Sequence, residues 1–415
     1  MVALCLAALV VSIVCSTLVT LFIRTLAQRY EWASGLTSSH HIHERRVPRL
    51  GGIAIYLTFL TMAAVYVWLA RCFSFAPPLG SEILKLLIPA GFLFLTGLID
   101  DLRGLSARAK LLGQVIGGLL LYASGFHLFE ALLRNLHPWA GTALSLGATV
   151  FFVVLMCNAM NLIDGLDGLS AGVSLFSMVT ILVFAWVAGA IPVVVATVIL
   201  AGSVAGFLFF NFCPASIFLG DSGSLFLGFM LSGLVISLSA RQERALNSLL
   251  LPVFCFALPL ADTGISVLRR FISRRPLFQA DRGHVHHMLL NLGLSHRAAV
   301  LTLYTVAGIG TIFSFVLLYP SYILLASTAS IFLLGMMFCV RKLGYQEFAS
   351  INWIWQQLRE QRSAANLSLV EAGSRNGAAP AYRLPRHGRV PADISMEEMP
   401  STSVLPDVHA EEAAG

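Results

Sequence analysis

The chain places acidic side chains where runs of apolar residues end, and these residues could do chemistry. Asp100 and Asp101 close one such run, and Arg108 and Lys110 open the next. Two adjacent carboxylates repel each other unless a cation or a proton relieves the repulsion. The pair therefore indicates either a catalytic cation site, with Lys110 as a phosphate contact, or a solvated helix end followed by basic membrane anchors.

A second cluster, residues 158–170, joins two apolar runs and contains no Lys or Arg. Two Asp-Gly turns hold two carboxylates and two amides close together, as hard oxygen ligands for Mg²⁺ or Ca²⁺ would be. The spacing is not that of an EF-hand loop, and a plain turn between helices is the alternative. The candidate residues are Asn158, Asn161, Asp164 and Asp167.

A third cluster, from Asn211 to Ser224, has a single carboxylate, Asp221, between small residues just before another apolar run. Small residues there let backbone N–H groups approach an anion at a helix N-terminus, while Asp221 holds a metal that bridges the same anion. Asn211 and Phe218 are candidate substrate contacts. Phe218 could stack on a nucleobase, or it could serve only in packing.

A fourth region runs from Asp262 to His287 and is rich in arginine and histidine. Arginine forks match phosphate oxygens, so the region suits a polyanionic substrate. Its candidates are the histidines His284, His286 and His287, together with Arg282. A zinc site is the alternative for three histidines, but no Cys or Glu lies nearby and the other acidic clusters favour a harder ion.

The composition indicates which kind of element positions these residues, namely apolar helices. Of 415 residues, 57% are hydrophobic and only 12% are charged. A bilayer core about 30 Å thick needs roughly 20 apolar residues per helix, and the sequence contains about eleven such stretches. We therefore predict an all-α integral membrane protein with about eleven transmembrane helices and cytoplasmic catalytic loops. The stretches begin near Val2, Gly51, Ile83, Leu111, Leu144, Gly168, Ile191, Ser224, Ser248, Ala298 and Ser321.

The distribution of basic residues predicts the orientation. The first stretch lacks a basic segment before it and is longer than the apolar core of a cleaved signal peptide, so we expect a retained helix. Lys and Arg favour cytoplasmic loops. One set of alternate loops contains Arg24, Arg29, Arg45, Arg46, Arg49, Arg103, Arg108, Lys110, Arg269, Arg270, Arg274, Arg275, Arg282 and Arg297, whereas the other contains only Arg71, Lys85, Arg134, Arg241 and Arg244. The acidic clusters are therefore predicted to face the cytoplasm, with the N-terminus outside.

The chain divides into one large domain and a tail. Residues 1–341 are predicted to form a single multi-spanning domain, and their sequence shows no internal repeat. Residues 342–362 contain apolar side chains at helical spacing, which indicates either an amphipathic helix on the membrane surface or an unstructured extension. Residues 363–415 are predicted to be a disordered cytoplasmic tail. The net charge of +6 lies near the membrane and in the tail, which favours lipid contact over nucleic-acid binding. The cysteines have no paired spacing that would predict disulfides.

Together the motifs resemble the polyprenyl-phosphate N-acetylhexosamine 1-phosphate transferases of the glycosyltransferase 4 family. The resemblance covers about Arg24 to Leu294 and rests on five motifs in the same order. These are His43 to Gly52, the Asp100-Asp101 pair with Lys110, Asn158 to Gly168, Asn211 to Ser224, and Asp262 to His287.

The resemblance implies a reaction and a set of roles. Such enzymes transfer GlcNAc 1-phosphate, or a related sugar phosphate, from a UDP-sugar to undecaprenyl phosphate in the bacterial inner membrane, and UMP leaves. By position, Asp221 resembles the principal Mg²⁺ ligand, and Mn²⁺ is an alternative ion. Close to the metal or the reacting phosphates the resemblance places Asp100, Asp101 and Asp167. Phe218 resembles a uracil-stacking position. Lys110, Asn161 and the histidine motif, His284 to His287, resemble pyrophosphate contacts. A homodimer is also expected.

Two motifs distinguish branches of this family. Val47 to Gly52 and His284 to His287 depart from the pattern of the phospho-MurNAc-pentapeptide transferases of peptidoglycan synthesis. The resemblance therefore favours an enzyme that initiates O-antigen, teichoic acid or enterobacterial common antigen, with the pentapeptide transferase as the alternative. The alternative of another class is an ion-coupled transporter, but transporters usually place acidic residues near the bilayer midplane in broken, repeated helices.

Overall fold

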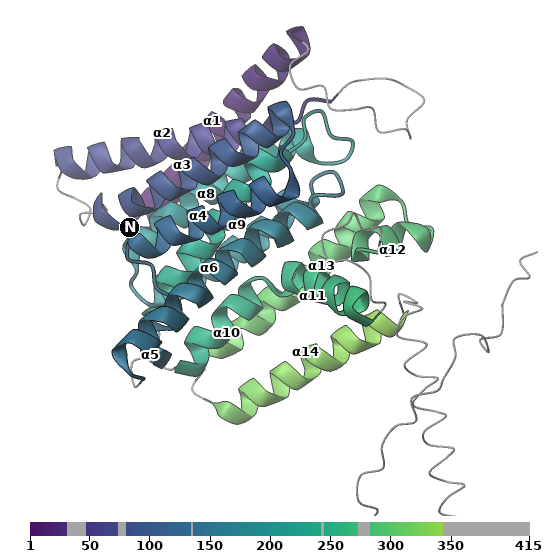
Figure 1. Cartoon of the computed structure of the whole chain (residues 1–415). Helices are drawn as coiled ribbons and strands as arrows, with labels where there is room; N and C mark the ends of the chain where they lie inside the picture. Colours follow the sequence, from purple (N-terminus) through teal and green to yellow (C-terminus); the bar gives the residue numbers. More distant parts are fainter. Residues whose placement is uncertain are drawn as a thin grey trace, which may run out of the picture. The chain divides into compact units, whose positions relative to one another are not determined.

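The computed structural model describes residues 1–30, 47–73, 80–133, 136–241, 245–272, 283–319 and 321–342. Within these ranges the chain is helical and contains no strand, as the apolar runs predict (Figure 1). The described helices all belong to one compact unit, Met1–Ser350. The predicted surface helix after Lys342 and the predicted disordered tail lie outside the described residues.

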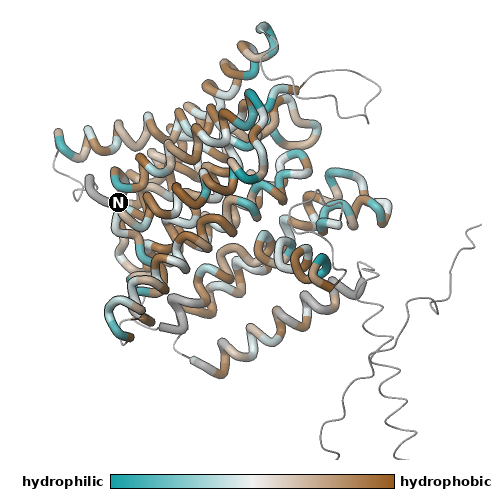
Figure 2. The backbone as a smooth tube through the Cα atoms, in the orientation of Figure 1, coloured by the Kyte–Doolittle hydropathy of each residue, from teal (hydrophilic) through white to brown (hydrophobic). Residues whose placement is uncertain are grey.

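Seven helices in the described part of the chain are long and apolar enough to cross a membrane. Figure 2 shows that their bodies are mostly apolar and that hydrophilic residues gather toward their ends. The chain is therefore a multi-pass membrane protein. The seven are α1 (Val2–Arg29), α2 (Gly51–Phe73), α6 (Pro138–Ile163), α7 (Leu169–Val187), α8 (Ile191–Asn211), α9 (Gly220–Ser239) and α13 (His296–Ser314) with the 3-10 turn η1 (Phe315–Leu318).

The prediction of about eleven spans is not confirmed. α4 has only 17 residues, and the span expected from Ser248 is divided at Phe256 into α10 and α11. Pro252 and Pro259 lie on either side of this break, and each lacks the N–H group that a continuous helix would use. The remaining helices are α3 (Gly80–Arg103), α4 (Ala107–Ala123), α5 (Glu130–Leu133), α10 (Ala245–Cys255), α11 (Ala257–Ile272), α12 (Val285–Asn291) and α14 (Tyr322–Lys342).

Helix α9 is the centre of the bundle. Every residue from Ser222 to Ser239 is buried, and α2, α3, α6, α7, α8 and α10 all pack against this helix. Helix α1 is the opposite case, because most of its large apolar side chains are exposed and its main partner is α8. Exposed apolar side chains suit a lipid environment, whereas the enclosed α9 can hold its N-terminus in one place.

Small residues bring the helices into close contact. Ser12 and Ser16 of α1 face Gly202 and Gly206 of α8, and a Cβ atom at Gly206 would lie 2.4 Å from the carbonyl oxygen of Ile13. Lipid tails are as apolar as the side chains, so helices in a bilayer associate through this kind of van der Waals packing. The bundle is therefore sensitive to added volume at its helix crossings.

Gly228 tests this packing at the crossing of α9 and α6. A Cβ atom there would lie 2.7 Å from the Cα atom of Cys157 and 2.8 Å from the carbonyl oxygen of Met156. Gly228→Ala should therefore destabilise the protein by about 1–3 kcal/mol, the usual cost of overpacking. Thermal unfolding of detergent-purified protein measures the change, with the reaction of the buried thiols with a labelling reagent as the signal.

The matched control is Gly147→Ala on the exposed side of α6, where an added Cβ atom has no neighbour within 4 Å. Alanine favours a helix more than glycine does, so this variant should be at least as stable as the wild type. Equal stability of the two variants would contradict the proposed close packing of α9 on α6.

Candidate active site

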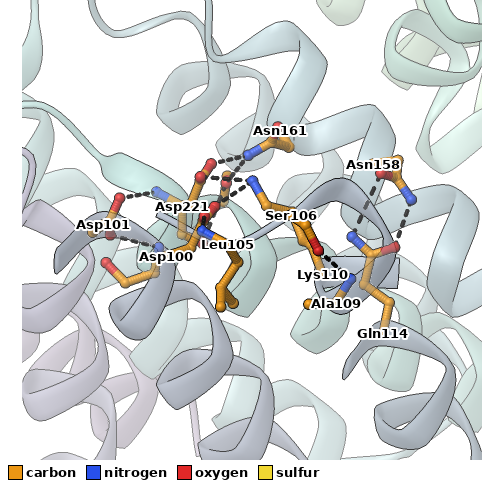
Figure 3. A network of polar contacts seen from close by, with 12 residues as sticks. Asp100, Asp101, Leu105, Ser106, Ala109, Lys110, Gln114, Asn158, Asn161 and Asp221 are labelled. Carbon is orange, nitrogen blue, oxygen red and sulfur yellow. Dashed lines mark hydrogen bonds and ion pairs between the residues drawn. The ribbon is translucent and has the colours of Figure 1, made fainter. Parts of the chain in front are cut away.

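Residues from three of the predicted clusters meet where α3, α4, α6 and α9 come together (Figure 3). The Nζ atom of Lys110 lies 2.8 Å from Oδ2 of Asp221 and also forms an ion pair with Asp100. We call Asp100, Lys110 and Asp221 the charged triad. The side-chain amide of Asn161 donates hydrogen bonds to Asp221 and, at 3.0 Å, to the hydroxyl of Ser224. Four helices thus contribute to one polar cluster.

A tight turn places Asp100 and Lys110 side by side. Gly104 has a φ of +71°, which favours glycine, and the Ser106 hydroxyl caps α4 by accepting the N–H of Ala109 at 3.2 Å. The N–H of Leu105 donates to Asp100 at 2.6 Å. The ends of α3 and α4 are therefore held together by Asp100 from both sides of the turn.

The charged triad is enclosed but accessible. The side chains of Lys110 and Asp221 are 21% and 28% exposed, whereas Asp100 is 8% exposed. Ionised groups that are only partly hydrated are stabilised by pairing, and each carboxylate oxygen can accept more than one hydrogen bond. An anionic ligand could therefore reach Lys110 and Asp221 without first unfolding the site.

Asp101 has partners different from those of its neighbour. Its two carboxylate oxygens accept the backbone N–H groups of Asp221 at 2.7 Å and of Ser222 at 2.8 Å. These N–H groups belong to the second and third residues of α9, in the first turn, where backbone N–H groups have no partner within the helix and the sequence predicted that an anion would bind. In this structure a carboxylate from α3 accepts hydrogen bonds from both groups, and anion binding at this helix end stays a prediction.

A pair of side-chain amides lies next to the charged triad, one helical turn along α4. Gln114 and Asn158 exchange two hydrogen bonds, of 3.5 Å and 2.6 Å, and Asn158 also donates to the carbonyl oxygen of Val154 at 2.7 Å. Gln114 is buried, and the sequence analysis missed it. Its position four residues after Lys110, on the same face of α4, was the available signal. A substrate contact by Asn158 stays a prediction.

The loop between α8 and α9 is held by predicted site residues. Asp167 accepts the N–H of Ala215 at 2.9 Å, and the buried Asn211 donates to the carbonyl oxygen of Ile217 at 3.0 Å. Phe218 is half-buried, and its N–H donates to the carbonyl oxygen of Pro48 at 2.9 Å. In this structure Asn211 and Asp167 support the loop, and the predicted substrate contacts of Asn211 and Phe218 stay predictions.

The surroundings of Asp164 disfavour its ionised form. It follows directly after α6 and is half-buried. Burial raises the pKa of its carboxyl well above the usual range, as do the nearby carboxylates of Asp221, Asp101 and Asp167, and Arg49 only partly opposes them. A cation placed among these groups would relieve the repulsion.

The donor groups suit a hard divalent ion. Asp and Asn oxygens are the ligands that Mg²⁺ prefers. No three His, Cys, Asp or Glu side chains among the described residues converge as a closed metal site. Mg²⁺ usually takes one or two carboxylates and completes its shell with water and substrate phosphates, so an open site of this kind fits it. Asp221 and Asp167 remain the predicted ligands.

The fourth cluster joins the site through α11 and α12. Nδ1 of His284 lies 3.0 Å from Asp262 on α11, and Asp262 also accepts the N–H of Val285 at 2.8 Å. His286 packs against the second cluster, because a Cβ atom at Gly165 would lie 2.3 Å from its Nε2 atom. The rings of His286 and His287 are 4.2 Å apart. Arg282 and the motif residues before Val47 lie outside the described residues.

Helix α11 turns its polar face inward. Asp262, Arg269 and Arg270 are buried, whereas Phe271 is 78% exposed. Two of the arginines that the sequence placed in a cytoplasmic loop, Arg269 and Arg270, thus lie on a helix. Arg269 is in close contact with Gly283, at the start of the histidine segment.

His286 makes the stability of the protein depend on pH. Burial, with a smaller contribution from the neighbouring His287, lowers the pKa of its imidazole to about 4. The unfolded chain has a histidine pKa of about 6.5, so between these values the unfolded state binds more protons. Stability should therefore fall as the pH decreases from about 6.5 to about 4.

His286→Gln should remove this part of the pH dependence, which amounts to up to about 3 kcal/mol in the free energy of unfolding. Thermal unfolding followed by tryptophan fluorescence at several pH values measures it. His296→Gln, at an exposed histidine, is the control and should keep the wild-type slope. Parallel pH profiles for the wild type and His286→Gln would contradict the assignment of a buried neutral imidazole.

Known proteins share these features. The model of glycosyl transferase family 4 matches residues 83–239, which run from α3 to α9. A probable undecaprenyl-phosphate N-acetylglucosaminyl 1-phosphate transferase from Bacillus subtilis is 32% identical over 321 residues, 74% of this chain and 85% of the relative. A decaprenyl-phosphate N-acetylglucosaminephosphotransferase from Mycolicibacterium smegmatis is 33% identical over 316 residues, 69% of this chain and 76% of the relative.

A phospho-N-acetylmuramoyl-pentapeptide-transferase from Streptococcus pyogenes is a more partial match. It is 34% identical over 223 residues, which cover 50% of this chain and 63% of the relative. The first two relatives match over most of their length and carry the same kind of name, and the family model covers the helices that form the charged triad. The chain therefore belongs to the polyprenyl-phosphate N-acetylhexosamine 1-phosphate transferases of glycosyl transferase family 4.

Proposed function

We propose that this enzyme transfers N-acetylglucosamine 1-phosphate from UDP-GlcNAc to undecaprenyl phosphate. The observation that carries the proposal is the charged triad, in which one lysine lies between two carboxylates at the end of a membrane bundle. The names of the Bacillus and Mycolicibacterium relatives support the sugar and the lipid class. The product, a diphosphate-linked sugar lipid, would initiate O-antigen or another cell-surface glycan.

The reaction is a direct displacement at phosphorus. An oxygen of the polyprenyl phosphate attacks the β-phosphorus of the donor, while the bond from that phosphorus to the bridging oxygen breaks. UMP leaves with the bridging oxygen and its electron pair. A phosphate monoester has a second pKa of about 6, so the nucleophile is largely ionised at neutral pH and a general base is optional.

The residues of the site have different roles in this reaction. Lys110 supplies positive charge to the diphosphate, and Asp100 keeps its ammonium group in place. Asn161 orients Asp221 through its amide. Mg²⁺ held by Asp221 and Asp167, with Mn²⁺ as an alternative, would neutralise charge on the diphosphate and on departing UMP.

We place this site on the cytoplasmic face of the bacterial inner membrane. Arg24 and Arg29 lie in the last two turns of α1, and Arg103 and Arg108 flank the turn that holds the charged triad. Basic residues at helix ends favour the cytoplasm. A UDP-sugar donor would meet the polyprenyl phosphate at this surface.

The test is an assay of purified protein with undecaprenyl phosphate and Mg²⁺. UDP-GlcNAc, UDP-GalNAc and UDP-MurNAc-pentapeptide are supplied separately, and UMP and the lipid product are measured by mass. We expect UMP and product with UDP-GlcNAc, and neither without Mg²⁺ or in Asp221→Asn. Product with only the pentapeptide donor would assign the alternative branch. No product from any donor, with folded protein, would contradict the proposal and direct attention to transport.

Lys110 gives a sharper prediction. Lys110→Met removes the cation that compensates Asp100 and Asp221, so kcat should fall by about 100-fold or more, the usual cost of losing one group that stabilises transition-state charge. Lys85→Met, at an exposed lysine on α3, is the matched control and should keep near wild-type turnover. Near wild-type kcat in Lys110→Met would show that Lys110 does not contact the reacting phosphates.

A further inference from the structure

We infer that the two adjacent aspartates have separate tasks, and that Asp101 is a positioning residue which fixes the backbone of Asp221 and not a ligand of metal or substrate. Asp100 is then the member of the pair that faces the reacting phosphates. The inference rests on the proposed function. It also makes a claim about hydrogen bonding that can be tested without any turnover.

Both carboxylate oxygens of Asp101 already accept a hydrogen bond from the backbone of α9. One accepts the N–H of Asp221 at 2.7 Å and the other accepts the N–H of Ser222 at 2.8 Å. The N-cap residue of α9 is Leu219, whose side chain makes no capping hydrogen bond. A helix usually satisfies its first N–H groups with a local Ser, Thr, Asp or Asn. Here a carboxylate from another helix, α3, takes that role.

Two glycines leave room for α3 to lie close to the backbone around Asp221. Gly220 has a φ of +74°, and a Cβ atom there would lie 2.8 Å and 2.9 Å from the two oxygens of Asp101. One turn earlier on α3, Gly97 would place a Cβ atom 2.4 Å from the carbonyl oxygen of Asp221. Glycines at both places therefore let α3 lie close to the backbone on either side of Asp221.

The neighbouring carboxylate, Asp100, has different partners. Its partners are the N–H of Leu105 and the ammonium group of Lys110, and Lys110 in turn contacts Asp221. Asp100 thus belongs to the charged triad, whereas Asp101 lies against the backbone. Successive residues on a helix point about 100° apart, so α3 presents the two carboxylates to different neighbours.

The expected consequence is a loss of rate without a loss of donor binding. Misplacement of a reacting group by about 1 Å can cost about 100-fold in rate. In Asp101→Asn one side-chain oxygen remains, while the NH₂ group faces an N–H donor, so kcat should fall about tenfold or more. Asp101→Ala removes both acceptors and should cost about 100-fold, and the KM for UDP-GlcNAc should stay within about twofold in both variants.

Amide hydrogen exchange tests the hydrogen bonds themselves in detergent-purified, full-length protein. Asp101→Asn should speed exchange at Asp221 and Ser222 by about tenfold, whereas Asp100→Asn should speed it at Leu105 and leave Asp221 and Ser222 unchanged. Ser295→Ala removes the hydroxyl that caps α13 through the N–H of Ala298 at 3.3 Å. This variant is the control for loss of a helix cap as such, and it should keep kcat.

Three results would overturn the inference. Unchanged exchange at Asp221 and Ser222 in Asp101→Asn would show that the cap is absent. Faster exchange with wild-type kcat would show that the cap does not position Asp221. A higher KM for donor or a higher Mg²⁺ requirement, with kcat unchanged, would make Asp101 a ligand. If Asp101→Asn does not fold, Gly97→Ala disturbs the same backbone and should lower kcat with KM unchanged. If the wild-type protein releases no UMP, the proposed function is wrong. The exchange measurement still tests whether Asp101 caps α9.

Discussion

Charged groups at the end of a membrane bundle must be paired, and this constraint determines the arrangement of the central helices. Burying a lone carboxylate or ammonium group costs several kcal/mol. Lys110 on α4 therefore has to lie where it can reach both Asp100 on α3 and Asp221 on α9. The fully buried α9 needs its first N–H groups satisfied as well, which brings Asp101 against it. The residues that pair these charged groups thus lie on the same helices that pack in the core of the bundle.

The residue types of the site could be predicted from sequence, but their partners could not. Acidic residues at the ends of apolar runs marked three clusters, and the structure brings Asp100, Asn161 and Asp221 together. The sequence could not show that Asp101 faces the backbone of a helix more than a hundred residues later. Its small residues near Asp221 suggested a free anion site, because a cap from another helix leaves no local signal.

The same limit applies to the helices. Apolar runs predicted where helices form, since length and composition suffice for that. They did not predict that the run from Ser248 would break at Phe256, or that α11 would turn Arg269 and Arg270 inward. Whether a polar face meets water or protein depends on tertiary packing, which the pattern of one helix does not contain. The histidine segment joins the site for a similar reason, through Gly165 and His286.

The balance of charge explains why a divalent cation belongs in the proposal. His286 has a pKa of about 4 and is neutral at physiological pH, so this histidine adds no positive charge. The pKa of Asp164 is raised first by burial and then by several carboxylates that Arg49 only partly compensates. Lys110 is already shared by Asp100 and Asp221. A diphosphate would add further negative charge to this cluster. Oxygen ligands with surplus negative charge favour a hard divalent ion, and this is the physical reason to expect Mg²⁺ with the donor.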